Sequence, residues 1–116
     1  MPAEHKIDEI HVVCNTHWDR EFRETFELTR RNLLDMFDVL LTVMERDPRY
    51  TSFTLDAHAI LVEDYLEMRP ERRPEVKKLL RERRLLMGPW YTLPDSMNVG
   101  GEALVRNFLR AQRVAA

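Results

Sequence analysis

The chain has 116 residues, of which 44% are hydrophobic and 33% charged, and its formal net charge is −2. This balance is typical of one small soluble domain, and it gives no electrostatic reason to expect nucleic acid or an anionic membrane as a partner. A single cysteine, Cys14, excludes an internal disulfide and suits a reducing compartment. The start of the chain lacks the apolar core of a signal peptide, and no apolar run reaches the length of a membrane span. We therefore expect a cytoplasmic location.

The first predicted element is a short strand over residues 10–14, where the sequence IHVVC is almost continuously apolar. A run of this length suits a strand of a parallel sheet that is covered on both faces. Such a strand would bury Cys14 as a small hydrophobic residue. Residues 15–23 are polar and predict a loop.

Apolar residues then recur at steps of three, four and seven between about residues 24 and 46, which predicts an amphipathic helix. Pro48 limits this helix, because the residue before a proline is pushed out of the helical region. The alternating sequence TSFTLD that follows predicts a second strand, ending at Asp56.

Two shorter helices are predicted next, the first ended by Pro70 and the second opened by Pro74. The sequence LLMGPW over residues 85–90 predicts a third strand. Residues 91–101 are rich in turn-forming residue types and predict a loop. The last predicted helix covers residues 102–113, with four apolar residues facing inward: Leu104, Val105, Phe108 and Leu109.

Strands that alternate with helices predict an α/β fold, with a parallel sheet built from βα units. Three such units do not close a barrel, so we expect a small open sheet. Its last strand would have a bare edge, which a second copy of the chain could cover in a homo-oligomer. We expect residues 1–116 to be the front, incomplete part of a longer architecture.

Polar or aromatic side chains follow each predicted strand. In parallel α/β folds, ligands bind beyond the carboxyl ends of the strands, so these side chains should meet at one end of the fold. The candidates are, strand by strand, His17 and Asp19, then Asp56 and His58, then Trp90 and Asp95.

Each candidate also has an ordinary structural explanation. His17 and Asp19 are spaced to point the same way from an extended segment and are both good zinc ligand types. Spacing alone nevertheless favours an ion pair in a loop, because matches this short are often accidental. Asp56 could equally cap the following helix. Asp95 could be a turn residue, and Trp90 could pack against its neighbours rather than bind a sugar.

Longer segments add a family resemblance. HVVCNTHWDREF, SFTLDAHAILVEDYLEMRPE and GPWYTLPDSMNVGGEALVRNFL resemble glycoside hydrolase family 38, the α-mannosidases, whose N-terminal motif typically reads HVVPHTHWDREW. The likeness runs in order from about His11 to Val114. It implies that the chain is the N-terminal portion of a β/α barrel-like catalytic domain. It also implies a retaining enzyme that hydrolyses terminal α-mannosides or oligosaccharides, with one Zn²⁺ in each complete active site.

The resemblance implies a role for several residues of this sequence. His17 and Asp19 correspond to two of the four zinc ligands, and Phe22 to an aromatic residue that packs against the sugar. We expect three further residues to line the substrate pocket: Trp90, Asp95 and Asp56. The family's other two zinc ligands, one of which is also the nucleophile, belong to later segments that residues 1–116 do not match.

The sequence also departs from the family pattern. Asn15 replaces a histidine that is not a zinc ligand, and Phe22 replaces a tryptophan. TLDAH replaces a common TLDGQ, which makes His58 unusual, and Ser96 stands where an acidic residue is frequent. These changes fit a diverged member or a copy no longer under selection.

We expect the isolated chain to lack mannosidase activity, because it lacks the nucleophile. The alternative is a free-standing, non-catalytic α/β module that binds carbohydrate or metal.

Overall fold

The computed structural model describes residues 7–115. Helices and strands alternate along the chain: β1 (Asn15–Thr16), α1 (Phe26–Arg46), β2 (Phe53–Leu55), α2 (Ile60–Met68), the 3-10 helix η1 (Pro70–Arg72), α3 (Arg73–Arg81), β3 (Leu85–Leu86) and α4 (Gly101–Ala115). The predicted α/β class and the predicted order of elements are confirmed.

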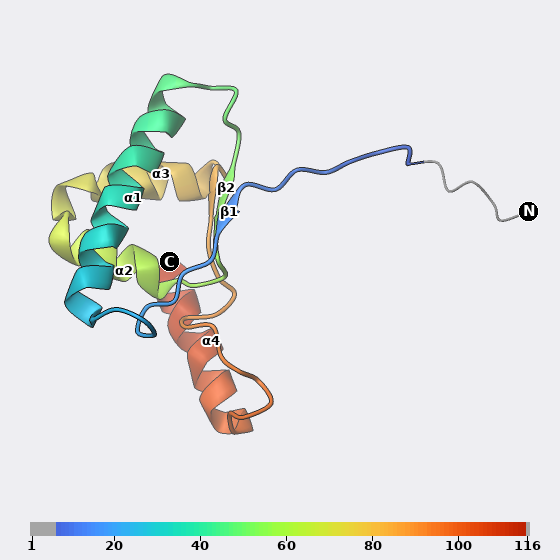
Figure 1. Ribbon diagram of the computed structural model, residues 1–116, viewed down its shortest axis with the longest axis vertical. Helices are drawn as coiled ribbons and strands as arrows, with labels where there is room; N and C mark the ends of the chain where they lie inside the picture. Colours follow the sequence, from blue (N-terminus) through green and yellow to red (C-terminus); the bar gives the residue numbers. More distant parts are fainter. Residues whose placement is uncertain (1–6, 116) are drawn as a thin grey trace, which may run out of the picture.

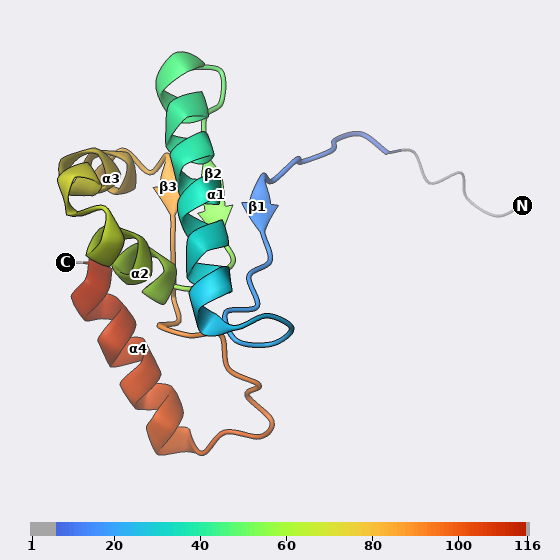
Figure 2. The ribbon, with the colours of Figure 1, turned by 60° about the vertical axis from the view of Figure 1, so that its left-hand side comes forward.

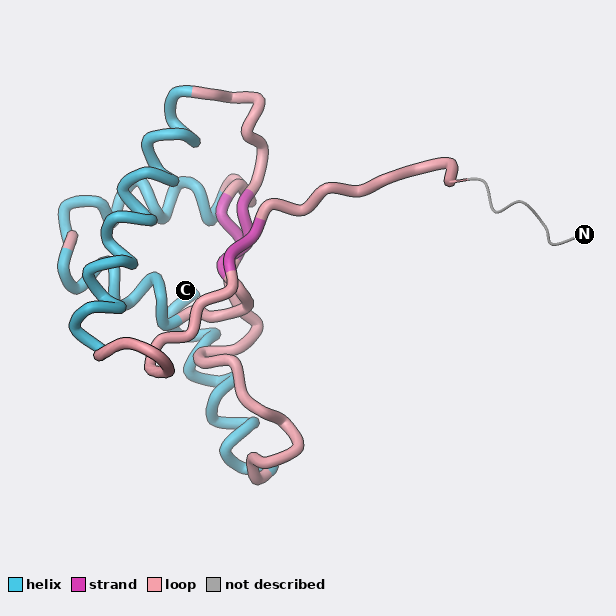
Figure 3. Tube along the Cα trace, in the orientation of Figure 1, coloured by secondary structure: helices cyan, strands magenta, loops and turns pink. Residues whose placement is uncertain are grey.

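The three strands form one parallel sheet, as predicted, and lie in the order β1-β2-β3 (Figures 1 and 3). Thr54 in the central strand lies opposite Asn15 on one side and Leu86 on the other. Because all three strands run the same way, the loops that follow them leave from the same end of the sheet, at the carboxyl ends of the strands.

The helices cover one face of this sheet. In Figure 1, α1, α2 and α3 lie on one side of the strands, and within residues 7–115 the other side carries no helix. Figure 2 shows α4 below the sheet, reaching back to the end of α2. The expectation that the strands are covered on both faces is therefore wrong for the described residues.

The core lies between the sheet and this helical layer. The rings of Phe37 in α1 and Tyr65 in α2 are fully buried and stack with their centroids 4.3 Å apart. The Tyr65 hydroxyl donates a hydrogen bond to Asp38 at 2.8 Å. Burial raises the pKa of Tyr65 to about 12, and the bond to Asp38 adds to the rise. Fully buried aliphatic residues complete the core: Leu33, Leu41, Met44, Leu55, Leu61, Val76 and Leu85.

α1 begins and ends where the sequence signals it. The Thr25 hydroxyl accepts a hydrogen bond from the Leu28 N–H at 3.3 Å, which satisfies one free donor of the first turn. The helix stops at Asp47, the residue before Pro48. Neither this helix nor any other within residues 7–115 combines the length and apolar character that crossing a membrane requires.

The predicted first strand over residues 10–14 is wrong. Pairing begins only at the Cys14 carbonyl, which accepts a hydrogen bond from the Thr54 N–H at 2.9 Å, and continues through β1. β2 is three residues long, so the residues before Cys14 have no neighbouring backbone to bond. Ile10 and Val12 are consequently 77% and 85% exposed, and Cys14 is exposed rather than buried.

The predicted inward face of the last helix is also largely wrong. Val105 and Leu109 are 53% and 55% exposed, and the buried residue of α4 is Ala111, near its C-terminal end. Only that end of α4 reaches the body of the fold in Figure 1, beside α2. Phe108 stacks on Trp90 and Leu104 is half-buried, but Val105 and Leu109 stay largely exposed.

Replacing Tyr65 by Phe should remove part of the pH dependence of stability above pH 10. The fold favours the neutral hydroxyl, so its contribution is complete below the ordinary pKa of 10.0 and is lost as the pH rises towards about 12. Over this range, the free energy of unfolding should fall by up to about 2 kcal/mol more in the wild type than in Tyr65→Phe. Urea unfolding at several pH values measures both slopes, and equal slopes would contradict the raised pKa.

Candidate functional site

The loops after the three strands meet at a cavity of about 390 Å³. Residues 17–22 from the loop after β1, His58 after β2 and residues 92–93 after β3 line it. A larger cavity of about 680 Å³ lies between α2, α3 and α4, but none of the predicted site residues lines it. Of the predicted site residues, His17, Asp19 and Phe22 line the smaller cavity.

His17 and Asp19 lie side by side in the wall of this cavity. His17 Nε2 is 3.3 Å from Asp19 Oδ1, and the two side chains are 69% and 53% exposed. Two ligands at ordinary zinc distances in a tetrahedral site lie roughly 3.3 Å apart, so the pair fits two adjacent positions of such a site. Within residues 7–115, no group of three or more histidine, cysteine or acidic residues could hold a metal ion. The described residues thus bring two side chains of metal-ligand type together, without a third.

Asp56 lies directly behind His17. Its Oδ2 accepts a hydrogen bond from the Trp18 N–H at 2.8 Å and is 2.9 Å from His17 Nδ1. The alternative role as a helix cap is wrong, because α2 begins at Ile60 after Ala59 and has no side-chain cap. Asp56 instead joins the end of β2 to the loop after β1, and it does not line the cavity.

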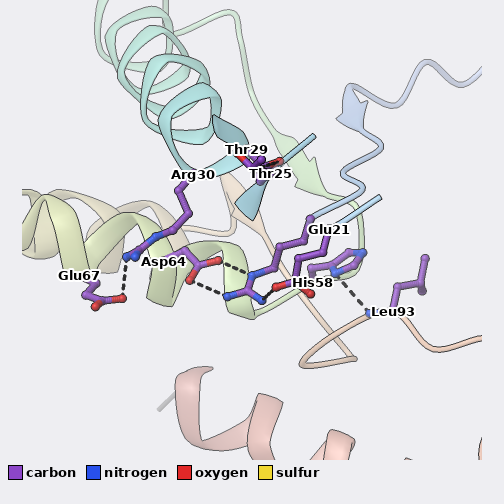
Figure 4. Close-up of polar contacts among 9 residues, drawn as sticks. Glu21, Thr25, Thr29, Arg30, His58, Asp64, Glu67 and Leu93 are labelled. Carbon is purple, nitrogen blue, oxygen red and sulfur yellow. Dashed lines mark hydrogen bonds and ion pairs between the residues drawn. The ribbon is translucent and has the colours of Figure 1, made fainter. Parts of the chain in front are cut away.

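His58 is buried at the base of the cavity, with 8% of its surface exposed. Its Nδ1 accepts a hydrogen bond from the Leu93 N–H at 3.3 Å (Figure 4), and its Nε2 is 3.6 Å from Asp56 Oδ2. Burial lowers the pKa of His58, although the nearby Asp56 opposes the shift. The imidazole is therefore neutral at pH 7 and links the second and third loops.

Arg20 fixes the first loop to the helical layer. Its Nε and Nη2 donate to the two carboxylate oxygens of Asp64 at 2.6 and 3.2 Å, and it also pairs with Glu21. The hydrogen bond to Asp64 raises the pKa of Arg20. Sequence analysis assigned neither residue a role. The available signal was an aspartate inside the apolar stretch ILVEDYL, since a buried carboxylate needs a partner.

Phe22 also lines the cavity, and 72% of the residue's surface is exposed. The guanidinium of Arg23 lies 5.7 Å from the centre of this ring. An exposed aromatic ring beside a polar cavity could pack against an apolar surface of a ligand.

Trp90 and Asp95 do not line the cavity. The ring of Trp90 stacks on Phe108 of α4 with the centroids 4.0 Å apart. The Asp95 carboxylate accepts hydrogen bonds from the Met97 N–H and the Asn98 amide, as a turn residue would. Contact of Trp90, Asp95 or Asp56 with a substrate stays a prediction.

Asn107 of α4 is a further residue that sequence analysis missed. Its Oδ1 accepts a hydrogen bond from the Tyr91 N–H at 2.6 Å, and its Nδ2 donates to the Thr92 carbonyl at 2.7 Å. The Asn107 side chain thus attaches the loop after β3 to α4 through hydrogen bonds to the loop backbone, and no local sequence pattern marks them.

Comparison with known proteins connects this geometry to one family. The model of the glycosyl hydrolases family 38 N-terminal domain matches residues 8–116. A protein of Halalkalibacterium halodurans with the provisional name mannosylglycerate hydrolase is 43% identical over 99 residues, which is 85% of this chain and 11% of that protein.

Two crystal structures from Enterococcus faecalis are also similar. One is an α-mannosidase, with a TM-score of 0.84 and 37% identity over 89% of this chain. The other is a protein of glycosyl hydrolase family 38, with a TM-score of 0.77 and 34% identity over 90% of this chain. The chain spans 12% of each of these structures.

The Arg20–Asp64 pair should show strong energetic coupling. Either Arg20→Leu or Asp64→Leu leaves one partly buried charge unpaired, so each should lower the free energy of unfolding by about 2–3 kcal/mol. The double variant should lose at least about 1 kcal/mol less than the sum of the two. Urea unfolding of the four proteins gives this coupling, and strictly additive losses would argue against it. Arg49→Leu breaks a surface pair with Asp47 and should change the free energy of unfolding much less, because exposed ion pairs contribute little to stability.

Ala57→Gly should stabilise the protein. Ala57 joins Asp56 to His58 with a φ of 58°, in the left-handed region where a β-carbon is strained. Glycine should raise the free energy of unfolding by about 1 kcal/mol. Ala103→Gly in the exposed first turn of α4 is the matched control, and it should lower the free energy by up to about 1 kcal/mol. A loss of stability in Ala57→Gly would mean that this backbone conformation is not strained.

Proposed function

Because the chain belongs to glycosyl hydrolase family 38, as part of its N-terminal domain, we propose that it supplies half of the zinc site of a retaining glycoside hydrolase acting on terminal α-mannosides. The observation that carries the proposal is the His17–Asp19 pair, whose ligand atoms lie 3.3 Å apart beyond the end of β1. The α-mannosidase and mannosylglycerate hydrolase names of the similar proteins support the mannoside part.

In this proposal, the residues of the cavity have separate roles. His17 and Asp19 would hold the zinc ion, which when bound offers the sugar hydroxyls a positive centre. Phe22 would pack its exposed ring against the apolar face of the sugar. The bonds from Arg20 to Asp64 hold the loop before any ligand arrives, so less order has to be gained on binding.

Hydrolysis itself needs more than these residues. A retaining glycosidase uses one carboxylate as nucleophile and a second carboxyl group as acid and then base. In our proposal the nucleophile lies outside residues 1–116, so the isolated chain should not hydrolyse mannosides. Hydrolysis of an aryl α-mannoside by the pure chain, with the activity lost in Asp19→Ala, would overturn this part.

Zinc titration by calorimetry tests the half site. Two ligands should supply about half the binding free energy of a four-ligand structural site, which corresponds to a dissociation constant of about 1–200 µM. His17→Ala and Asp19→Ala should each weaken binding at least about tenfold. His11→Ala is the matched control, because His11 Nε2 is also 3.3 Å from a carboxylate, that of Glu9, but lies outside the cavity.

The titration also separates the proposal from its alternative. Nanomolar binding that His17→Ala abolishes would mean that the site is completed within the chain or between two copies, and would favour the free-standing, non-catalytic module. Zinc binding that is unchanged in His17→Ala and Asp19→Ala would refute the assignment of this pair as ligands.

A further inference from the structure

Two histidines of this chain have nearly the same local surroundings. His11 and Glu9, like His17 and Asp19, are two residues apart, and in both pairs the histidine Nε2 lies 3.3 Å from a carboxylate oxygen. They differ at the other ring nitrogen. His17 Nδ1 is 2.9 Å from Asp56 Oδ2, whereas no ion pair is found at His11 Nδ1 within residues 7–115.

The position of Asp56 does not depend on His17. Asp56 follows directly after β2, the central strand of the sheet. The same Oδ2 also accepts a hydrogen bond from the Trp18 N–H at 2.8 Å. The Asp56 side chain is 18% exposed, against 69% for His17. A mostly buried carboxylate, hydrogen-bonded to the backbone, therefore faces a largely exposed imidazole.

This arrangement dictates where the His17 proton lies. Both ring nitrogens of His17 face a carboxylate, and an ionised carboxylate can only accept hydrogen bonds. A neutral imidazole has one proton to donate, and the shorter contact, 2.9 Å to Asp56 against 3.3 Å to Asp19, places that proton on Nδ1. Nε2 then carries a free lone pair on the side of Asp19. In water a neutral histidine side chain keeps its proton mainly on Nε2, the form that cannot bind a metal there. The partner of one ring nitrogen thus determines what the other can do.

His58 does not compete for this carboxylate oxygen. Its Nε2 is 3.6 Å from Asp56 Oδ2, beyond hydrogen-bond distance, and its Nδ1 already accepts from Leu93. Arg20 is committed to Asp64 and Glu21. Asp56 Oδ2 therefore faces two nitrogens, the Trp18 N–H that donates to it and His17 Nδ1.

We propose that Asp56 is a positioning residue that holds His17 in its Nδ1–H form and in one orientation, leaving Nε2 free to bind a metal. The inference rests on the proposed function for the identity of the metal, while the protonation and orientation of His17 follow from the described contacts. Asp56 acts through His17 and touches neither the ion nor the sugar.

Nitrogen NMR of the metal-free chain tests this directly. Long-range ¹H–¹⁵N spectra at about pH 8, above the ordinary imidazole pKa, report which ring nitrogen carries the proton. His17→Gln and His11→Gln assign the two signals. We expect the proton on Nδ1 in His17 and mainly on Nε2 in His11. A proton mainly on Nε2 in wild-type His17 would overturn the inference, whatever the variants do.

Substitutions at Asp56 then test the cause. Asp56→Ala should move the His17 proton to Nε2 and weaken zinc binding by about 10–100-fold. Asp56→Asn can keep an oxygen at the Oδ2 position, so it should retain the Nδ1 proton and recover part of the affinity. An unchanged His17 signal in a folded Asp56→Ala protein would refute the role of Asp56. If Asp56→Ala fails to fold, the wild-type and Asp56→Asn signals still decide.

Arg20→Leu controls for general loosening of the loop, since it releases the loop from α2 but leaves Asp56 in place. The His17 proton should stay on Nδ1 in that variant. If the proton moves to Nε2 instead, the order of the loop rather than Asp56 determines the protonation of His17. The outcomes also separate the two proposals. Zinc affinity that falls in His17→Ala but not in Asp56→Ala sinks only the inference. Absence of zinc binding in the wild type sinks the proposed metal site, while the NMR result still stands.

Discussion

The pairing of β2 with a strand on each side is the constraint on which the rest of the structure depends. The Thr54 N–H donates to the Cys14 carbonyl at 2.9 Å, and the Phe53 N–H donates to the Arg84 carbonyl at 2.8 Å. Leu55, with no exposed surface, anchors the same strand in the core. Because the three strands are parallel, this small ladder is enough to bring three loops to one edge, where the cavity forms.

Periodicity predicted the elements well and their surroundings poorly. The apolar spacing of α1 and the proline after it set that helix to within about two residues of its observed bounds. The apolar run before Cys14 was equally clear, but a strand also needs a neighbouring backbone, and β2 is too short to supply one. The apolar positions of α4 failed in the same way, since a hydrophobic face indicates a need for a partner without supplying one.

In the candidate site too, local sequence signals succeeded and contacts between distant residues were missed. The motif identified His17 and Asp19, and the sheet topology predicted that they would meet the residues after β2. The function of Asp56 stayed undecided, because its contact with Trp18 joins residues 38 positions apart. The bond between Arg20 and Asp64 spans 44 positions. Helix-capping residues and hydrophobic periodicity are local signals. Neither predicts which side chains far apart in the sequence will form hydrogen bonds or ion pairs.

The attachment of the third loop to α4 has a mechanical consequence for the cavity. Asn107 binds the backbone of Tyr91 and Thr92, and Trp90 stacks on Phe108. A movement of α4 should therefore carry the loop after β3 with it. In the same loop, the Leu93 N–H donates a hydrogen bond to His58. Tilting α4 would therefore draw one wall of the cavity away from the other, and the angle of a helix outside the site would set how wide the site opens.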